Sequence, residues 1–233
     1  MRKKQREDVW LNSVGNIYCL GRNYVLHAQE LRNEVPTSPM LFMKPTHALV
    51  AANGQTVTLP GNWGTIHFET ELVIHIGKPY EKGMNADELV DSMTVGIDFT
   101  LRDLQDELKK KGFPWLLSKG FKNSAVISRF IPFPGIEEFK KTSFALIKNG
   151  EKVQTGYTKD FIFDLQEIID YTGQHLGLGK GDMIFTGTPQ GVGPVFDGDK
   201  MILMLGEEIL GRFTLKLDWV KKALEPSFSA FAI

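Results

Sequence analysis

Residues 66–76 alternate between side chains that favour a core and side chains that carry charge, and this period of two is typical of a β-strand. Phe68 and Leu72 fall on one face of that strand, whereas Glu69 and Glu71 fall on the other. A chain with many such segments must fold around extended sheets. Further strands are predicted at residues 93–101, 144–147, 152–157, 183–186, 201–205 and 209–217, with a hairpin turn at Asn149-Gly150.

Helical patterns are fewer. The sequence predicts a helix over residues 102–111, ended by Gly112, and another over residues 164–176. Asp164 and Glu167 have the spacing of a capping box at the start of the second helix. Shorter helices are expected at residues 24–31 and 86–92. Because strands dominate and the helices do not alternate with them, we predict a strand-rich α+β fold.

The charge balance excludes several classes of protein. The 233 residues carry 27 basic and 28 acidic side chains, which argues against a dedicated nucleic-acid-binding protein. The only cysteine, Cys19, excludes an intrachain disulfide and a cysteine-rich zinc site, and it lies in an apolar run that predicts burial. We find no signal peptide and no apolar run that could span a bilayer, so we expect a cytoplasmic protein without membrane or nucleic-acid partners.

The composition is even along most of the chain and shows no repeat or linker. We therefore predict a polar lead-in over residues 1–15 and one continuous domain over residues 16–222. Residues 223–233 form an apolar C-terminal segment that we expect to dock on its own domain or on a partner subunit.

Three acidic residues form a candidate metal site. Glu69 and Glu71 lie two positions apart on one strand face, which places their carboxylates about 7 Å apart. Asp98 lies between two apolar residues of another predicted strand. Burying such carboxylates is costly unless a cation neutralises them, and oxygen ligands favour Mg²⁺, Mn²⁺ or Ca²⁺. The alternative is that both glutamates line the solvent face of an edge strand.

His27 and Glu30 lie three residues apart in a predicted helix, and therefore on one face. Glu30 could orient the imidazole so that it acts as a general base toward water. A solvated surface pair is the alternative interpretation.

A glycine-rich loop at residues 186–193 follows a predicted strand. Its backbone N–H groups and the Thr188 hydroxyl could bind a carboxylate or an enolate oxygen. The loop lacks the lysine of a nucleotide-binding P-loop, so a nucleotide site is not expected. A purely structural hairpin corner is the other possibility.

Eight short motifs occur in one order from about residue 17 to residue 213, and together they resemble the fumarylacetoacetate hydrolase family. The motifs are GRNY at 21–24, HxxE at 27–30, FxKP at 42–45, HFETEL at 67–72, GIDFTxRDLQ at 96–105, KGxPW at 111–115, SKxF at 118–121 and TGTPxGVGP at 186–194.

The resemblance implies a twisted, mixed β-sheet rolled around one active site, in a homodimer whose catalytic domain spans residues 16–222. It implies Mg²⁺ or Mn²⁺ held by Glu69, Glu71 and Asp98, and a segment carrying His27 and Glu30 that closes over substrate. The remaining residues it assigns are Lys119 as a catalytic group and Arg22, Arg102, Gln105 and Thr188 as substrate contacts, with Lys44 in a structural role.

The motif pattern is most similar to that of the small acylpyruvases and oxaloacetate decarboxylases of the family. It implies metal-dependent cleavage of a C–C bond in a small 2-oxo or 2,4-dioxo acid, by acylpyruvate hydrolysis or oxaloacetate decarboxylation, with the cation stabilising a pyruvate enolate. The chain lacks an aspartate ahead of His27 that supplies a fourth carboxylate in fumarylacetoacetases, which argues against fumarylacetoacetate as substrate. The alternatives are a 2-hydroxydienedioate isomerase or decarboxylase of aromatic catabolism, and a non-catalytic ligand-binding relative.

Overall fold

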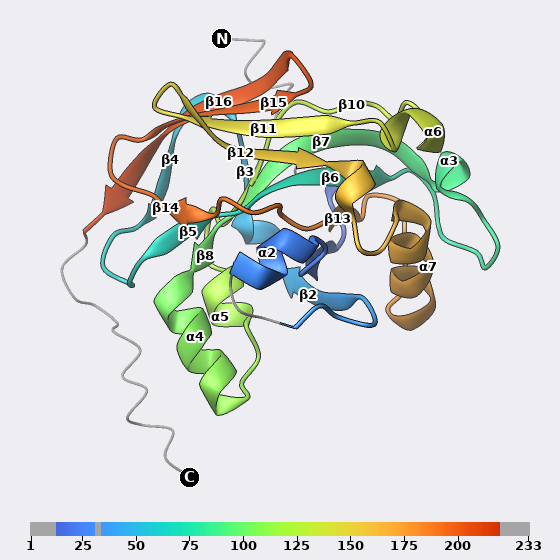
Figure 1. The fold of residues 1–233 in the computed structure, drawn as a ribbon, viewed down its shortest axis with the longest axis horizontal. Helices are drawn as coiled ribbons and strands as arrows, with labels where there is room; N and C mark the ends of the chain where they lie inside the picture. The colour runs from blue at the N-terminus through green and yellow to red at the C-terminus, as the bar shows by residue number, and fades with distance from the viewer. Residues whose placement is uncertain (1–12, 31–33, 220–233) are drawn as a thin grey trace.

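The computed structural model describes residues 13–30 and 34–219, and an eight-stranded mixed sheet lies at the centre of this region (Figure 1). The pairs β1–β13 and β3–β9 are parallel, and the other neighbours are antiparallel. In order across the sheet, the strands are β2 (Met40–Lys44), β1 (Ile17–Gly21), β13 (Met183–Phe185), β6 (Thr70–Ile76), β7 (Val90–Asp98), β9 (Ala125–Ile127) and β3 (Leu49–Ala51), with β10 (Ile131–Pro132) paired to β7.

This sheet is curled because its two edges are joined by a short connection. The edge strands β2 and β3 are linked by four residues that include the short helix η2 (Thr46–Ala48). A connection of that length spans at most about 17 Å. Seven strands laid flat would hold the edges about 29 Å apart. The sheet must therefore roll, which creates an inner face that strands from distant parts of the sequence share.

Two smaller sheets complete the strand structure. A five-stranded sheet lies over the outer face of the roll, as Figure 1 shows, and its hairpin turn has positive φ angles at Asn149 and Gly150, as the sequence predicts. Its order is β12 (Glu151–Tyr157), β11 (Ser143–Lys148), β15 (Lys200–Leu205), β16 (Glu208–Asp218) and β4 (Asn53–Pro60); the three-stranded sheet has the order β14 (Gly193–Pro194), β5 (Ile66–Phe68) and β8 (Thr100–Leu101).

The core has two parts that correspond to the two faces of the rolled sheet. Leu72 and Ile74 on β6 belong to the larger cluster, whereas Val73 between them belongs to the smaller one. The smaller cluster fills the inside of the roll and includes Cys19 and Phe185. Cys19 is fully buried, as predicted, and burial raises the pKa of its thiol well above the usual range.

The helices lie outside the sheets. α4 (Arg102–Lys111) ends at Gly112 in the left-handed conformation, and the Asp164 carboxylate accepts from the Glu167 amide to cap α7 (Leu165–His175). Both features confirm the sequence analysis. The remaining helices are α2 (Val25–Glu30), α3 (Ala86–Leu89), α5 (Leu116–Lys119), α6 (Ile136–Phe139) and η3 (Thr158–Asp160). Among the described residues, no helix is long and apolar enough to cross a membrane.

Three predicted elements are wrong in extent. The strand expected over residues 93–101 breaks at Phe99, because β7 belongs to the eight-stranded sheet and β8 to the three-stranded sheet. The helix expected over residues 86–92 ends at Leu89, because Val90 is extended and already pairs with Ile76 of β6. The strand expected over residues 66–76 breaks at Glu69, because β5 and β6 pair with strands of different sheets. Residues 1–12 of the lead-in, the end of the helix expected over 24–31, and residues 220–233 lie outside the described part of the chain. The strand-rich rolled sheet confirms the predicted fold class.

Gly96 tests the packing inside the roll. A Cβ on this residue would lie 2.7 Å from the Val126 carbonyl oxygen and 2.9 Å from both Phe185 and Val73. We expect Gly96→Ala to destabilise the fold by about 1–3 kcal/mol through overpacking. Gly179→Ala is the control, since its Cβ would meet only Asp182, at 3.7 Å. Urea denaturation measures both, and equal losses would contradict the described packing.

Candidate metal centre

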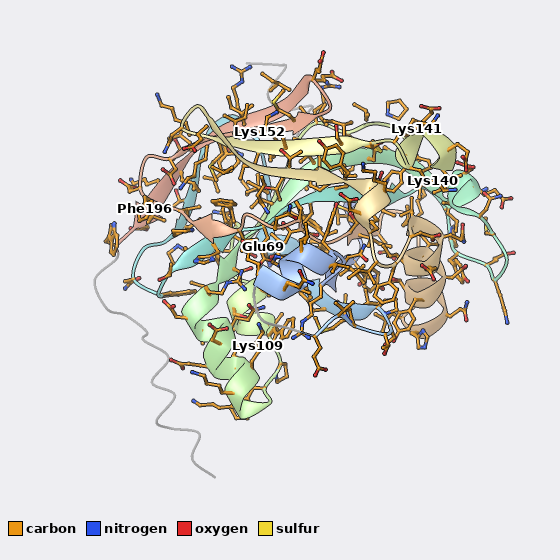
Figure 2. The ribbon with its side chains drawn as sticks, in the orientation of Figure 1. Glu69, Lys109, Lys140, Lys141, Lys152 and Phe196 are labelled. Atoms are coloured by element: carbon orange, nitrogen blue, oxygen red, sulfur yellow. The ribbon has the colours of Figure 1, made fainter. Side chains whose placement is uncertain are left out.

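The three predicted acids converge at one end of the inner face. Glu71 on β6 pairs with Gly96 on β7, and the backbone amide of Asp98 donates to the carbonyl of Glu69 at 2.8 Å. Glu69, Glu71 and Asp98 are 5%, 2% and 0% exposed, and one oxygen from each lies within 4.8 Å of the others. Figure 2 shows Glu69 near the middle of the molecule. The solvent-exposed edge that the sequence left open as an alternative is therefore wrong.

Lys119, at the end of α5, neutralises part of this charge. Its ammonium donates to Glu69 Oε2 at 2.6 Å, to Asp98 Oδ2 at 2.6 Å and to Thr100 Oγ1 at 2.7 Å. Burial alone would lower the pKa of Lys119, but Asp98 and Glu69 outweigh it and raise the pKa. The lysine is therefore charged, and all three of its N–H groups have acceptors.

Lys44, at the end of β2, holds the other side of Asp98. Its ammonium lies 2.7 Å from Asp98 Oδ1 and donates to Ser124 Oγ at 3.0 Å and to the Lys119 carbonyl. The lysine thus ties Asp98 to the backbone that carries Lys119. This agrees with the structural role that the resemblance implies.

Glu69 and Glu71 differ in their surroundings. Burial opposes ionisation of Glu69, but Lys119 and Arg102 hold its pKa well below the usual range, and Arg102 forms an ion pair with it. Burial, Asp98 and Glu69 together raise the pKa of Glu71. Glu71 accepts from the Gly187 amide at 2.7 Å and has no ion-pair partner among the described residues.

This arrangement fits a hard divalent cation. The donor set is three carboxylates, the ligand type that Mg²⁺ and Mn²⁺ prefer. The cation would supply the positive charge that Glu71 lacks. Because the cation would offset the charge of the acids, the positive charges of Lys119 and Arg102 could balance that of a bound anion.

A small cavity of about 30 Å³ lies over these acids. It has room for an ion or water and is far below the roughly 300–1,000 Å³ of a pocket for an organic ligand. An organic ligand could enter it only if part of its wall moved. Of the ten predicted site residues, eight line the cavity, namely Arg22, His27, Glu69, Glu71, Arg102, Gln105, Lys119 and Thr188.

The other two predicted residues lie just beyond the cavity wall. Asp98 is below it, fully buried between the two lysines. Glu30 is outside, where its carboxylate lies 3.4 Å from His27 Nδ1 and accepts from the Gly191 amide at 3.1 Å. Partial burial would raise the pKa of Glu30, but the His27 ring and the Gly191 amide lower it. The pair thus joins α2 to the glycine-rich loop.

The three predicted substrate contacts other than Thr188 are guanidinium and amide groups. Arg102 donates to Gln105 Oε1 at 2.6 Å, and both are buried. Arg22 holds a left-handed backbone with φ of 59°, which is unusual for a residue with a side chain and is found at functional sites. Together they place hydrogen-bond donors around the cavity.

Sequence reasoning missed Gln154, a buried residue of β12. Its side chain accepts from the Thr70 amide at 2.9 Å and donates to Thr188 Oγ1 and to the Pro189 carbonyl, each at 3.0 Å. The Thr188 hydroxyl in turn donates to the Thr70 carbonyl at 2.9 Å. Gln154 therefore holds the strand that carries Glu71 against the glycine-rich loop. Nothing in its local sequence distinguishes it from other polar residues on a half-buried strand.

Lys119→Met tests the charge balance of the metal-free site. The variant leaves Glu69 and Asp98 buried without this partner, so we expect a loss of about 3–5 kcal/mol in unfolding free energy in the presence of EDTA. Lys109→Met is the control, since Lys109 lines the same cavity but has only a long ion pair among the described residues, with Asp106 at 4.0 Å, and a cation–π contact with Trp115. Guanidinium denaturation checks both, and a Lys119→Met loss no larger than that of the control would contradict this account.

Comparisons with known proteins agree with this geometry. A family model described as the fumarylacetoacetate hydrolase C-terminal domain matches residues 16–216. The mouse mitochondrial oxaloacetate tautomerase is 38% identical over 86% of this chain and 91% of its own. The mitochondrial oxaloacetate decarboxylase of Dictyostelium discoideum is 39% identical over 78% of this chain and 84% of its own. The structure of a Pseudomonas aeruginosa fumarylpyruvate hydrolase, with Mn²⁺ and pyruvate, has a TM-score of 0.82 and 32% identity over 88% of this chain and 91% of that one. The chain therefore belongs to the fumarylacetoacetate hydrolase family.

Proposed function

We propose that this protein is a Mg²⁺- or Mn²⁺-dependent enzyme that acts on a small 2-oxo acid through its enolate. One observation carries the proposal: Glu69, Glu71 and Asp98 form a buried set of three carboxylates beside a charged lysine, and Glu71 has no ion-pair partner among the described residues. The Pseudomonas relative, whose structure contains Mn²⁺ and pyruvate, supports both the cation and the substrate class.

The acids would hold the cation, and the cation would act as a Lewis acid that stabilises negative charge on the substrate oxygens. Arg22 and Arg102 lie at the cavity and suit the carboxylate of a 2-oxo acid. The Nε of Arg102 is buried and has no hydrogen-bond partner among the described residues, so it remains a free donor. Lys119 keeps a positive charge beside the cavity, which favours a developing enolate.

His27 is the residue we propose for moving a proton. Glu30 faces Nδ1 of the ring, which leaves Nε2 for the substrate or for a water molecule. His27 lines the cavity, whereas Glu30 lies outside it, so the pair can carry a proton between the reaction and solvent.

Enol–keto conversion of oxaloacetate is the reaction best supported. It needs proton transfer at C3 and at the enol oxygen, with no attacking water, and the mouse relative is an oxaloacetate tautomerase. The cation, the two arginines and the His27–Glu30 pair meet these requirements.

Cleavage of a C–C bond is the second candidate, favoured by the Dictyostelium decarboxylase and the Pseudomonas hydrolase. In decarboxylation the C3–C4 bond of oxaloacetate breaks, CO₂ leaves, and the electron pair forms the pyruvate enolate that a proton then quenches at C3. In acylpyruvate hydrolysis His27 would first take a proton from the water that attacks C4. The C3–C4 bond then breaks, the acyl group leaves as a carboxylic acid, and the electron pair forms the same enolate, which is protonated at C3. A homodimer and a cytoplasmic location stay predictions of the sequence.

Metal dependence is the first test. We expect loss of enol absorbance from oxaloacetate, or pyruvate release from oxaloacetate or acetylpyruvate, to require Mg²⁺ or Mn²⁺ and to fall to background with EDTA. Glu71→Gln should abolish activity while the circular dichroism spectrum is retained, because it removes a carboxylate of the cation site that has no ion-pair partner among the described residues. Full activity in EDTA or in this variant would overturn the proposal.

His27→Gln separates proton transfer from cation binding. We expect kcat to fall about 100-fold or more, with Mn²⁺ affinity unchanged, because His27 is not among the three carboxylates. The matched control is His67→Gln, since His67 is half-buried but does not line the cavity. If decarboxylation survives in His27→Gln and acetylpyruvate hydrolysis does not, the histidine serves to activate water. Unchanged rates with every substrate would remove His27 from the mechanism.

A further inference from the structure

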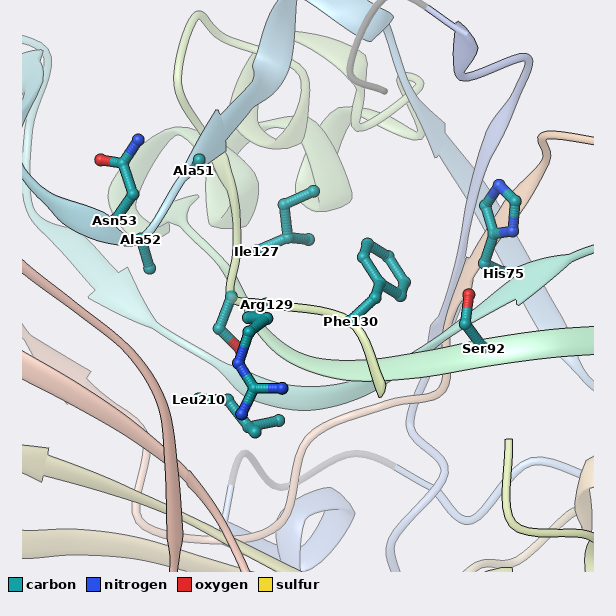
Figure 3. A pocket seen from close by; sticks show the side chains of 10 residues that line it. Ala51, Ala52, Asn53, His75, Ser92, Ile127, Arg129, Phe130 and Leu210 are labelled. Carbon is teal, nitrogen blue, oxygen red and sulfur yellow. The ribbon is translucent and has the colours of Figure 1, made fainter. Parts of the chain in front are cut away.

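A second cavity, of about 580 Å³, lies at the opposite end of the rolled sheet from the acids. Figure 3 shows the side chains that line it. Along β6, His75 is on the same face as Glu71 and four residues beyond it, a separation of about 13 Å. On β7, Ser92 pairs with His75 and shares the face of Asp98. The two strands that carry the candidate metal ligands therefore carry the second cavity at their other ends.

Packed side chains separate the two cavities. Val73 and Phe185 are fully buried in the smaller core cluster, between the two ends of the roll. Gly96 leaves no room beside them, since even a Cβ there would meet both side chains at 2.9 Å. No residue lines both cavities. The second cavity is thus a separate site rather than an entrance to the first.

Polar groups are arranged around this cavity as a built site. His75 Nδ1 lies 2.7 Å from Asp91 Oδ1, and the Ser92 hydroxyl donates to the same oxygen at 2.7 Å. Asp91 does not line the cavity, so it fixes the ring from behind and leaves Nε2 for a ligand. Figure 3 shows Asn53 on the side opposite His75, with Arg129 between them.

The one permanently charged residue of the lining is Arg129, a cation that is also ion-paired with Glu208. Arg129 lines the cavity, while its partner Glu208 does not. The ion pair with Glu208 uses one guanidinium nitrogen, NH2, so other N–H groups of Arg129 remain available. Among the lining residues there is no carboxylate, whereas Arg129 and the Asn53 amide can both donate hydrogen bonds.

Apart from Ser128, whose hydroxyl donates to the Val95 carbonyl, the rest of the lining is apolar. The Phe130 ring stands edge-on to His75, with ring centroids 5.8 Å apart. The volume is within the roughly 300–1,000 Å³ of pockets that hold organic ligands. The other apolar lining residues are Ala51, Ala52, Ile127 and Leu210.

We propose that this cavity is a binding site for a small organic carboxylate with an apolar body. The carboxylate would be recognised by Arg129 and Asn53, and by His75 in its protonated form, in which Nδ1 donates to Asp91 and Nε2 donates to the ligand. The body would pack on Phe130 and the apolar wall. This site is independent of the proposed reaction, because it shares no residue with the candidate metal centre.

Benzoate is a suitable probe, and benzyl alcohol is its neutral counterpart. We expect benzoate, added to metal-free full-length protein, to perturb NMR signals of His75 and Phe130, and benzyl alcohol to bind at least about tenfold more weakly. Arg129→Met and His75→Leu should each weaken benzoate about tenfold. Their circular dichroism spectra should match the wild type, since both side chains are at least partly exposed.

A control separates this site from the candidate metal centre, which would also attract a carboxylate. Glu71→Gln should leave benzoate affinity at the second cavity unchanged, since Glu71 lines only the smaller cavity. Equal binding of benzoate and benzyl alcohol would overturn the proposal, as would unchanged benzoate affinity in Arg129→Met and His75→Leu. The proposal would also be overturned if a second copy of the chain covered the cavity. Hydrogen exchange would show this as protection of the His75 and Phe130 backbone amides that increases with protein concentration.

Discussion

The attraction between three buried carboxylates and the cations around them is the constraint on which the rest of this structure depends. Glu69, Glu71 and Asp98 are almost inaccessible to solvent, and unpaired charges in that position destabilise the fold. Lys44 and Lys119 offset part of this cost from the two sides of Asp98. Glu71, in contrast, accepts a hydrogen bond from the Gly187 amide and has no ion-pair partner among the described residues. The site is therefore built for one more positive charge.

The rolled sheet is what brings these groups together. Lys44 lies at the end of one edge strand, whereas Glu71 and Asp98 lie on central strands and Glu69 directly precedes β6. In a flat sheet an edge lysine would be several strands away from the central acids. The short link between β2 and β3 forces the curl, and the curl places the edge lysine 2.7 Å from Asp98. The fold and the charge balance thus depend on the same geometric feature.

The features predicted correctly from the sequence are those that patterns within a few residues determine. The acidic pair on one strand face, the hairpin at Asn149-Gly150 and the cap of α7 all follow from spacing within a few residues. The sequence analysis missed what depends on distant contacts. Gln154 is 84 residues from the Thr70 amide that it accepts from, and the break at Glu69 arises because two sheets compete for one extended segment. Patterns of spacing carry no information about such pairings.

Direct Mn²⁺ binding is the measurement that tests the account most directly. Electron paramagnetic resonance of the purified chain should show one Mn²⁺ per chain. Glu71→Gln should weaken that binding by at least about 100-fold, because it removes a ligand charge and not merely a group that orients a ligand. Equal affinity in wild type and Glu71→Gln would contradict the central claim, since the buried acids would then be structural groups neutralised by Lys44, Lys119 and Arg102 alone.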